Sequence, residues 1–119
     1  MPQPVNLLQK LALFSDHWAP HIVAVLNDYD VKVVKMKGEF VWHDHEDTDE
    51  LFLVLRGRLR IELAGGAVEL SPGELYVVPR GVQHKPVADE ECEVLLMEPG
   101  GVVNTGRAGG PLTAIARPL

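Results

Sequence analysis

Two strand-like runs and three side chains that can ligate a metal ion are concentrated between Gly38 and Gly57. His43 and His45 are two positions apart at the end of the first run, so their rings point to one face if that run is a strand. A short polar connection leads to Glu50, which opens the second run, Leu51 to Leu55. We expect a hairpin between these runs to bring the carboxylate near both rings. Two imidazoles and a carboxylate suit zinc, iron, nickel, copper or manganese.

The acidic residues around the histidines leave the identity of the carboxylate ligand open. Asp49 competes with Glu50, and strand parity does not choose between them because Leu51 to Leu55 is apolar on both faces. Asp44 points away from its histidine neighbours by the same parity. We therefore expect it to belong to a solvated acidic loop, whose negative charge still favours a bound cation.

A fourth candidate ligand, His84, follows in a second stretch that contains glycine and proline. The first stretch has the spacing His43-x-His45, four residues, Glu50, six residues, Gly57, and the second has Gly73, five residues, Pro79-x-Gly81, two residues, His84. Together these spacings resemble the paired motifs of the cupin superfamily, over about residues 31–97. The chain looks like a small single-domain cupin of the group loosely named after mannose-6-phosphate isomerase.

This resemblance implies a ligand set for a divalent transition metal, with iron, manganese, zinc or nickel as the candidate ions. The implied ligands are His43, His45, Glu50 and His84. The family pattern thus selects Glu50 over Asp49. Two positions depart from it, because Gly38 precedes His43 by four residues rather than five and Ala88 replaces an asparagine. The second departure removes a polar side chain that the family has near the site.

The rest of the chain has the pattern of short strands joined by turns. Strand-like runs cover residues 21–26, 29–37, 59–63, 67–70, 75–78 and 92–97, with glycine, proline and asparagine in several connections. This pattern predicts an all-β sandwich or barrel, and the resemblance narrows it to a double-stranded β-helix, or jelly roll. Apolar residues at helical spacing predict a short helix over about residues 5–14, and residues 98–119 are expected to be a loop and tail. We expect one cupin domain, residues 1–119.

Strand parity also makes predictions about the aromatic and apolar neighbours of the ligands. Phe52 and Val54 share parity with Glu50, so we expect them to line the metal cavity. Phe40 and Trp42 share the strand face opposite the histidines, which favours core packing between sheets or a subunit interface over contact with a substrate.

Other chemically active side chains carry weaker signals. Tyr76 and Glu39 are candidates for proton transfer by residue type alone, so no catalytic residue is identified. Arg80 lies inside the second motif and is the arginine best placed to meet an anionic substrate. Cys92 is expected to be a buried strand residue, because nothing near it in the sequence would activate a thiol.

Composition argues against several classes of function. A net charge of −6 argues against nucleic-acid binding, because phosphates are usually met by a surplus of basic side chains. We expect no membrane span, since the apolar runs are far shorter than the roughly 20 residues that cross a bilayer. The N-terminus lacks the regions of a signal peptide, and the lone Cys92 cannot make an internal disulfide. We therefore expect a cytoplasmic location.

The resemblance leaves the reaction open, because cupins include isomerases, dioxygenases, lyases and plain sugar-binding proteins. The function it implies is a metalloenzyme that acts on a small oxygenated metabolite or sugar. The alternative is a non-catalytic module that binds a metal or a sugar, and a third hypothesis gives the metal only a structural role. We also expect a homodimer, with Ile22 to Leu26, Phe40 and Trp42 as its apolar interface.

Overall fold

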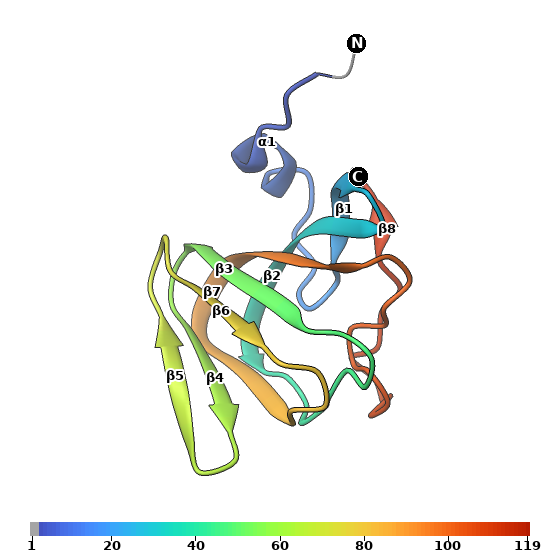
Figure 1. Cartoon of the computed structure of the whole chain (residues 1–119). Coiled ribbons are helices and arrows are strands. Elements are labelled where there is room, and N and C mark those ends of the chain that lie inside the picture. The colour runs from blue at the N-terminus through green and yellow to red at the C-terminus, as the bar shows by residue number, and fades with distance from the viewer. Residues whose placement is uncertain (1–2) are drawn as a thin grey trace.

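The computed structural model describes residues 3–119 as one short helix and eight strands (Figure 1). The elements in chain order are α1 (Leu7–Leu11), β1 (His21–Leu26), β2 (Tyr29–Glu39), β3 (Glu50–Arg56), β4 (Leu59–Leu63), β5 (Gly66–Leu70), β6 (Leu75–Val78), β7 (His84–Pro99) and β8 (Arg117–Pro118). The expected all-β class is confirmed.

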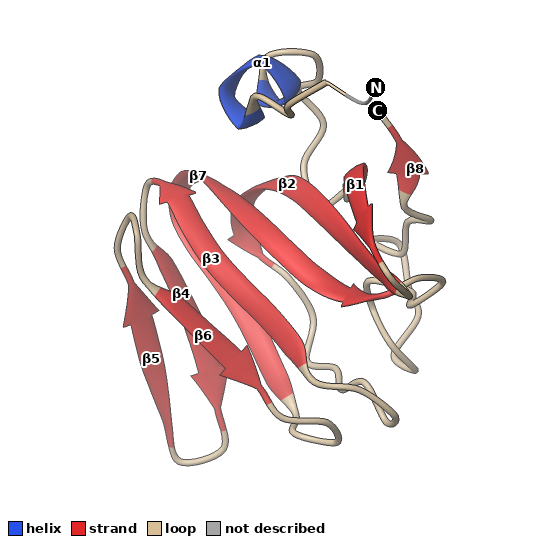
Figure 2. Cartoon of the chain, turned by 45° about the horizontal axis from the view of Figure 1, so that its top comes forward, coloured by secondary structure: helices blue, strands red, loops and turns tan. Residues whose placement is uncertain are grey.

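The long strand β7 joins the two halves of the sheet. It pairs antiparallel with β2 along both of its halves, with β4 near its start and with β3 near its end. Each of these neighbours then carries one further antiparallel strand, which is β1 beside β2, β5 beside β4 and β6 beside β3. The sheet curves round an interior without closing, and this gives the expected jelly-roll arrangement in an open form (Figure 2).

The expected hairpin between the two motif runs is not present. β3 pairs with β6 and β7, and the chain from Phe40 to Asp49 is irregular apart from one bridge between His43 and His84. The strand expected at residues 92–97 is also longer than predicted, because β7 begins at His84. The sequence thus predicted the positions of the strands better than their pairing, since β3 pairs with segments that are distant in the chain.

The interior is filled by apolar side chains from alternate positions of the strands, as expected where one face of a sheet is buried. The buried strand residues of this core include Val34, Met36, Phe52, Val54, Leu59, Ile61, Val78, Cys92, Val94 and Leu96. Gly57 makes the tight turn before β4 with a φ of 83°, and a Cβ there would lie 2.8 Å from the Cβ of Cys92. Glycine is therefore required at this position by both its conformation and its packing.

The helix is shorter than the sequence predicted. α1 begins after Asn6, whose side chain accepts a hydrogen bond from the backbone N–H of Gln9, and it ends at Leu11 rather than near Phe14. Leu11 is buried, whereas Leu8 is 65% exposed. A helix that buries so little of its apolar face gains little from further turns, which explains its early end.

The C-terminal part of the chain returns to the edge of the sheet. After β7 it runs without regular structure until β8, which pairs in parallel with β1 (Figure 1). Within residues 3–119, no helix has the length and apolar character that crossing a membrane requires.

Candidate metal centre

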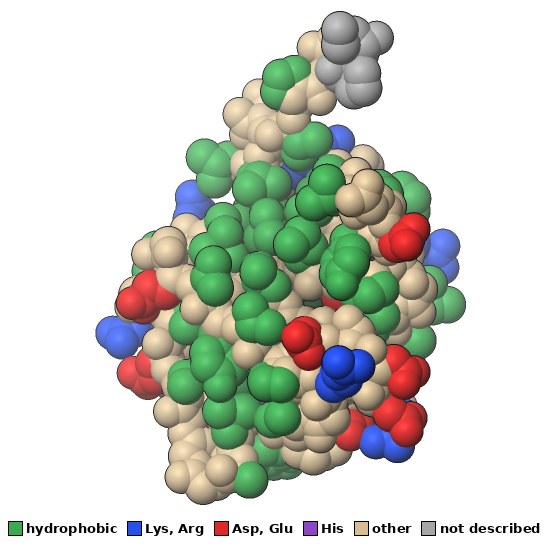
Figure 3. Space-filling view, in the orientation of Figure 1, with side chains coloured by type: hydrophobic (Ala, Val, Ile, Leu, Met, Phe, Trp, Pro, Cys, Tyr) green, Lys and Arg blue, Asp and Glu red, His purple; other side chains and the backbone are tan. Residues whose placement is uncertain are grey.

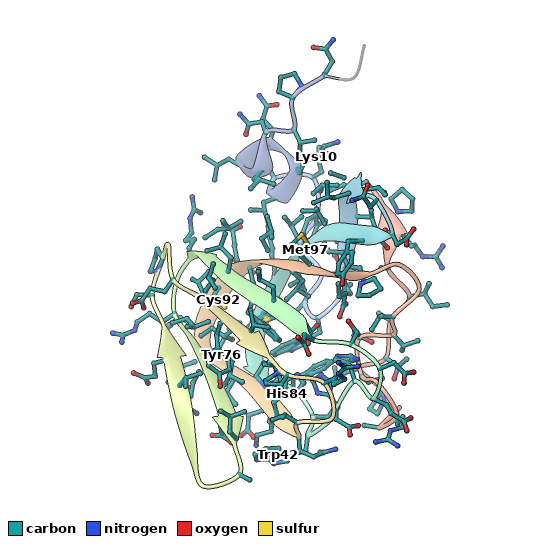
Figure 4. All side chains as sticks on the ribbon, viewed as in Figure 1. Lys10, Trp42, Tyr76, His84, Cys92 and Met97 are labelled. Atoms are coloured by element: carbon teal, nitrogen blue, oxygen red, sulfur yellow. The ribbon has the colours of Figure 1, made fainter. Side chains whose placement is uncertain are left out.

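The structure brings together the side chains of His43, His45, Glu50 and His84. Glu50 opens β3 and His84 opens β7, while the other two residues lie on the irregular segment after β2. Two backbone hydrogen bonds hold this segment against β7, from His43 N to His84 O at 3.0 Å and from His84 N to His43 O at 2.9 Å. Figure 4 shows His84 within the body of the molecule, whereas Trp42 lies at its lower edge.

The rings of His43 and His84 are oriented by backbone carbonyl groups. Nδ1 of His43 lies 2.9 Å from the oxygen of Val41, and Nδ1 of His84 lies 2.9 Å from the oxygen of Val82. A carbonyl oxygen only accepts hydrogen bonds, so both Nδ1 atoms carry the proton and each Nε2 keeps a free lone pair. This tautomer is the one that presents Nε2 to a metal ion.

The four side chains are close enough to share one ion. One potential ligand atom from each residue lies within 4.8 Å of all the others. Oε1 of Glu50 is 3.2 Å from Nε2 of His45 and 3.3 Å from Nε2 of His84. The exposed fractions are only 2% for His43, 6% for His45, 4% for Glu50 and 1% for His84. The cluster therefore forms a nearly dry site.

One fully buried nitrogen of this cluster has no hydrogen-bond partner in the part of the chain that the structure describes. Nε2 of His45 is buried and approaches Glu50 without the geometry of a hydrogen bond. A buried polar atom without a partner is energetically costly, and in the neutral ring with its proton on Nδ1 this nitrogen would offer its lone pair to a metal ion. The donor set, its burial and this unpaired nitrogen fit a divalent transition metal ion.

The electrostatics of the cluster keep its members in different protonation states. Burial lowers the pKa of His43 to about 4, helped by the neighbouring His84. Burial also acts to lower the pKa of His45, but the adjacent Glu50 carboxylate outweighs it and raises that pKa above its usual value. Burial acts to raise the pKa of Glu50, yet His45 and His84 hold it well below its usual range. The site thus contains a carboxylate and at least one imidazole that stays neutral.

A buried ion pair lies next to the cluster. Nζ of Lys32 is 3.0 Å from Oε1 of Glu98, and both side chains are 1% exposed. The second oxygen of Glu98 is without a partner among the described residues. Burial, followed by the charge of Glu50, raises the pKa of Glu98 to about 8. The carboxyl group of Glu98 therefore lies beside Glu50, the candidate carboxylate ligand.

The structure separates the acidic residues that the sequence left as alternatives. Asp49 is turned away from the rings and accepts a hydrogen bond from the backbone N–H of Arg80 at 2.9 Å. Asp44 points away from the cluster, as expected, but it is buried rather than solvated because Arg107 covers it. Only Glu50 among these three acids joins the histidines.

The expectations for the neighbouring aromatic residues are met only in part. Phe52 faces the interior beside the cluster, with its ring centre 6.0 Å from that of His84, and Val54 is fully buried. Phe40 packs in the core, as expected, but its predicted placement on the face opposite the histidines is wrong, because its ring packs edge-on against His43 at 5.2 Å. The strand ends at Glu39, so alternation does not extend to Phe40.

The proton-transfer candidates Tyr76 and Glu39 do not acquire a clear role. Glu39 is exposed and pairs with Lys85 at 2.5 Å, outside the cluster. Tyr76 is partly buried against the core on β6. Arg80 is exposed on the loop before β7 and is not among the residues that line the cavity beside the cluster.

A small apolar cavity adjoins the cluster. Its free volume is about 20 Å³, close to the space that one water molecule requires. The lining residues are Trp18, Pro20, Val34, Met36, Phe40, His43, Glu50, Phe52, Pro86, Leu96 and Asn104. The sequence analysis missed Trp18 and Asn104, because neither lies in a motif or a strand.

Asn104 connects the segment before β1 with the C-terminal segment. Its side-chain nitrogen donates to the carbonyl oxygens of Trp18 and Leu112, each at 3.0 Å, and its side-chain oxygen accepts from the backbone N–H of Ala114 at 2.9 Å. The sequence analysis also missed the pair of Lys32 and Glu98. Both residues lie at the alternate positions of their strands whose side chains face the interior, so strand alternation could have identified them.

Comparison with known proteins gives concordant results. The family model described as "Cupin domain" matches residues 29–98. A solved cupin-2 domain protein from Shewanella frigidimarina NCIMB 400 is 49% identical, with a TM-score of 0.79 over 80% of this chain and 93% of its own. A structure from Neisseria meningitidis is 30% identical, with a TM-score of 0.75 over 82% of this chain and all of its own (100%).

A curated relative extends the comparison by sequence. The protein YdbB of Bacillus subtilis (strain 168) is 31% identical over 86 residues, which are 71% of this chain and 76% of that protein. The matched family region contains all four clustered side chains, whereas Trp18 and Asn104 lie outside it on opposite flanks.

Proposed function

The chain belongs to the cupin family, and from this premise we propose that it binds one divalent transition metal ion and acts as a metalloenzyme on a small oxygenated molecule. His43, His45, Glu50 and His84 would hold the ion. The observation that carries this proposal is the convergence of these four buried side chains, in which Nε2 of His45 has no other partner.

When bound, the ion would supply Lewis acidity or oxygen activation at an oxygen-bearing ligand. The protein groups prepare the site for it. The carbonyl groups of Val41 and Val82 fix the proton on Nδ1 of two histidines and direct each Nε2 inward. The apolar walls exclude water, so charges inside the site interact more strongly than they would in solution.

The first test is the metal content of protein purified without an affinity tag. We expect about one transition-metal ion per chain, and we expect the His45→Ala variant to lose it. Thr48→Ala is a matched control, because Thr48 lies in the same loop and its hydroxyl donates a hydrogen bond to the backbone oxygen of Asp49, outside the ligand cluster. Absence of metal from the unaltered protein, even after reconstitution, would refute the proposal.

One observation favours the alternative of a non-catalytic binding module. Neither Glu39 nor Tyr76 is hydrogen-bonded to the cluster, and Ala88, at the position of the family asparagine, is fully buried in the core. A panel of small oxygenated metabolites and sugars separates the two functions. Turnover by the metal-loaded protein supports the enzyme, whereas saturable binding without turnover supports the module.

We further propose that the chain forms a homodimer, but through a different surface from the one the sequence suggested. Phe40 is only 8% exposed, so it is not available to an interface. Two cross-strand rows on the outer face of β6, β3 and β7 are apolar instead, and Figure 3 shows hydrophobic side chains gathered on this side. The rows consist of Val77, Leu51 and Met97, and of Leu75, Leu53 and Leu95.

Light scattering of two variants tests this interface. Leu75 is 55% exposed on the proposed surface and Val25 is 66% exposed on β1, within the surface first expected. We predict that Leu75→Lys converts the dimer to a monomer and that Val25→Lys leaves it intact, because a buried unpaired lysine strongly disfavours association. A dimeric Leu75→Lys variant together with a monomeric Val25→Lys variant would mean that the interface is on β1. A monomeric unaltered protein would refute the dimer.

A further inference from the structure

We propose that the cavity beside the ligand cluster selects a small uncharged molecule that is apolar except for one oxygen-bearing end, and that Trp18 is the wall that moves to admit it. This inference rests on the proposed function, because the cluster would meet the oxygen-bearing end. It adds the substrate class and a residue that determines specificity.

The wall of the cavity is polar where it meets the ligand cluster and largely apolar elsewhere. Its polar groups from the cluster are His43 and Glu50, and strand residues such as Met36, Phe52 and Leu96 supply an apolar floor. Trp18 stacks on Phe40 with ring centres 4.7 Å apart and completes an aromatic wall. A ligand with one polar end and an apolar body matches this division.

The cavity is poorly suited to sugars and sugar phosphates. Among residues 3–119, no lysine or arginine contributes to its lining. Asn104 is polar, but both its amide nitrogen and its oxygen are already engaged by the backbone of Trp18, Leu112 and Ala114. The hydroxyl or phosphate groups of a sugar would therefore lose their hydration without gaining partners, at a cost that opposes binding.

A ligand larger than water requires one wall to move, because the free volume is only about 20 Å³. Most of the floor consists of paired strands, whereas Trp18 lies on the irregular segment between α1 and β1. Its φ of 62° is unusual for a residue with a side chain, and such a conformation is strained. Release of this strain would favour displacement.

Specific contacts hold Trp18 in the closed position. Its backbone N–H donates to Lys35 O at 2.8 Å, its indole N–H donates to Lys37 O at 3.0 Å, and its own carbonyl accepts from Asn104. Trp18 and Asn104 both lie outside the matched family region at 29–98. Residues on the flanks of the matched region thus close the cavity.

The test uses Trp18 as its own reporter. The sequence has two tryptophans, and Trp42 is 44% exposed at the surface, so Trp42→Phe leaves Trp18 as the sole fluorophore of this type. The zinc-loaded variant is titrated with cyclohexanol, glucose and mannose 6-phosphate, three probes that absorb no exciting light. We expect cyclohexanol to shift the Trp18 emission saturably, and both sugars to bind at least tenfold more weakly.

A second variant tests the location of the binding site. Met36→Phe adds volume to the cavity floor, and Val25→Phe adds a comparable ring on the exposed face of β1. We expect the former to weaken cyclohexanol binding at least tenfold with zinc content unchanged, and the latter to have no effect. Thermal unfolding of both variants verifies that each is folded.

The outcomes separate this inference from the proposed function. A zinc-loaded protein in which Trp18 shows binding of mannose 6-phosphate or glucose as tight as that of cyclohexanol, or responds to none of the probes, would overturn the inference and leave the metal site intact. A protein that binds no metal but whose Trp18 responds saturably to cyclohexanol would refute the metalloenzyme and support the cavity. Unchanged binding to Met36→Phe would also count against the proposed location.

Discussion

Arg107 reaches from the C-terminal segment to Asp44, the residue between the two histidines of the first motif. Nη2 of Arg107 lies 2.7 Å from Oδ2 of Asp44, and its Nε lies 3.4 Å from Oδ1, across a sequence separation of 63 residues. Gly106 beside it packs on the Asp44 carbonyl so closely that a Cβ would clash. This contact fixes the C-terminal segment beside the ligand cluster.

We predict that Arg107→Gln accelerates metal loss without much change in thermal stability. Removal of the pair frees the segment that covers the His45 side of the site, so a chelator gains access more often. The pair itself contributes little to folding, because the Arg107 side chain is 63% exposed and screened by water. Stopped-flow measurement of zinc transfer to a chromogenic chelator should show a rate increase of several-fold.

Arg58→Gln provides the control for this experiment. Arg58 forms a comparable exposed pair with Glu69 at 3.4 Å, far from the C-terminal segment. We expect its rate of zinc transfer to match that of the unaltered protein. Equal rates for Arg107→Gln and Arg58→Gln would show that the segment does not limit access to the metal.

The buried pair of Lys32 and Glu98 leads to a second prediction. Lys32→Met removes the hydrogen-bond partner of the Glu98 carboxyl group, whose raised pKa keeps it protonated at neutral pH, so the free energy of unfolding should fall by about 1–3 kcal/mol. The double variant Lys32→Met with Glu98→Leu should recover most of this loss, because apolar replacement of a whole buried pair is often neutral. Urea unfolding of the metal-free proteins measures both effects.

The result for the double variant is the decisive one. If it is no more stable than Lys32→Met alone, the two side chains are not coupled as their 3.0 Å contact indicates. Lys35→Met is a useful comparison, since Lys35 lies on the same strand but is less buried and 3.9 Å from its nearest carboxylate. Its effect on unfolding should be clearly smaller.

The sequence predicted local features well because short-range spacing determines them. The turn at Gly57 and the strand at Leu75 to Val78 follow directly from the identity of nearby residues. The pairing of β3 was mispredicted because a hairpin assumes that sequence neighbours pair, whereas β3 pairs with β7 about forty residues later. Strand parity failed at Phe40 for a related reason, since the strand ends one residue earlier.

The candidate site shows the same division. The spacing of the motifs and the family resemblance predicted all four of the side chains that the structure brings together. The residues that shape access to them were not predictable, because Trp18, Asn104 and Arg107 occupy irregular segments and act through contacts between distant parts of the chain. Local patterns carry no information about such contacts.

Cys92 should be unreactive in the folded protein. Burial, reinforced by the flanking charges of Glu91 and Glu93, raises the pKa of its thiol to about 12, so almost no thiolate exists at neutral pH. We expect a disulfide exchange reagent such as Ellman's reagent to modify it only as fast as the protein unfolds. Rapid modification under native conditions, at a rate that a stabilising ligand does not change, would contradict this burial.

Protonation of His45 should affect stability in opposite directions without and with metal. In the metal-free protein the pKa of His45 is raised above its unfolded value, so the stabilisation from its protonated form is present below about pH 6.5 and is lost as pH rises through the folded pKa. His43 contributes in the opposite direction, because its pKa of about 4 lies below the unfolded value: this contribution to stability is fully present above about pH 6.5 and falls as pH drops toward 4.

Metal binding reverses the contribution of His45 because a cation requires the neutral form of its ring. The increase in Tm on addition of zinc should therefore be small near about pH 6 and larger near about pH 8. Differential scanning calorimetry at both pH values, with and without zinc, measures it. His45→Ala should show little zinc-dependent shift at either pH. A zinc-dependent shift that is larger at the lower pH would mean that His45 does not bind the ion through its neutral ring.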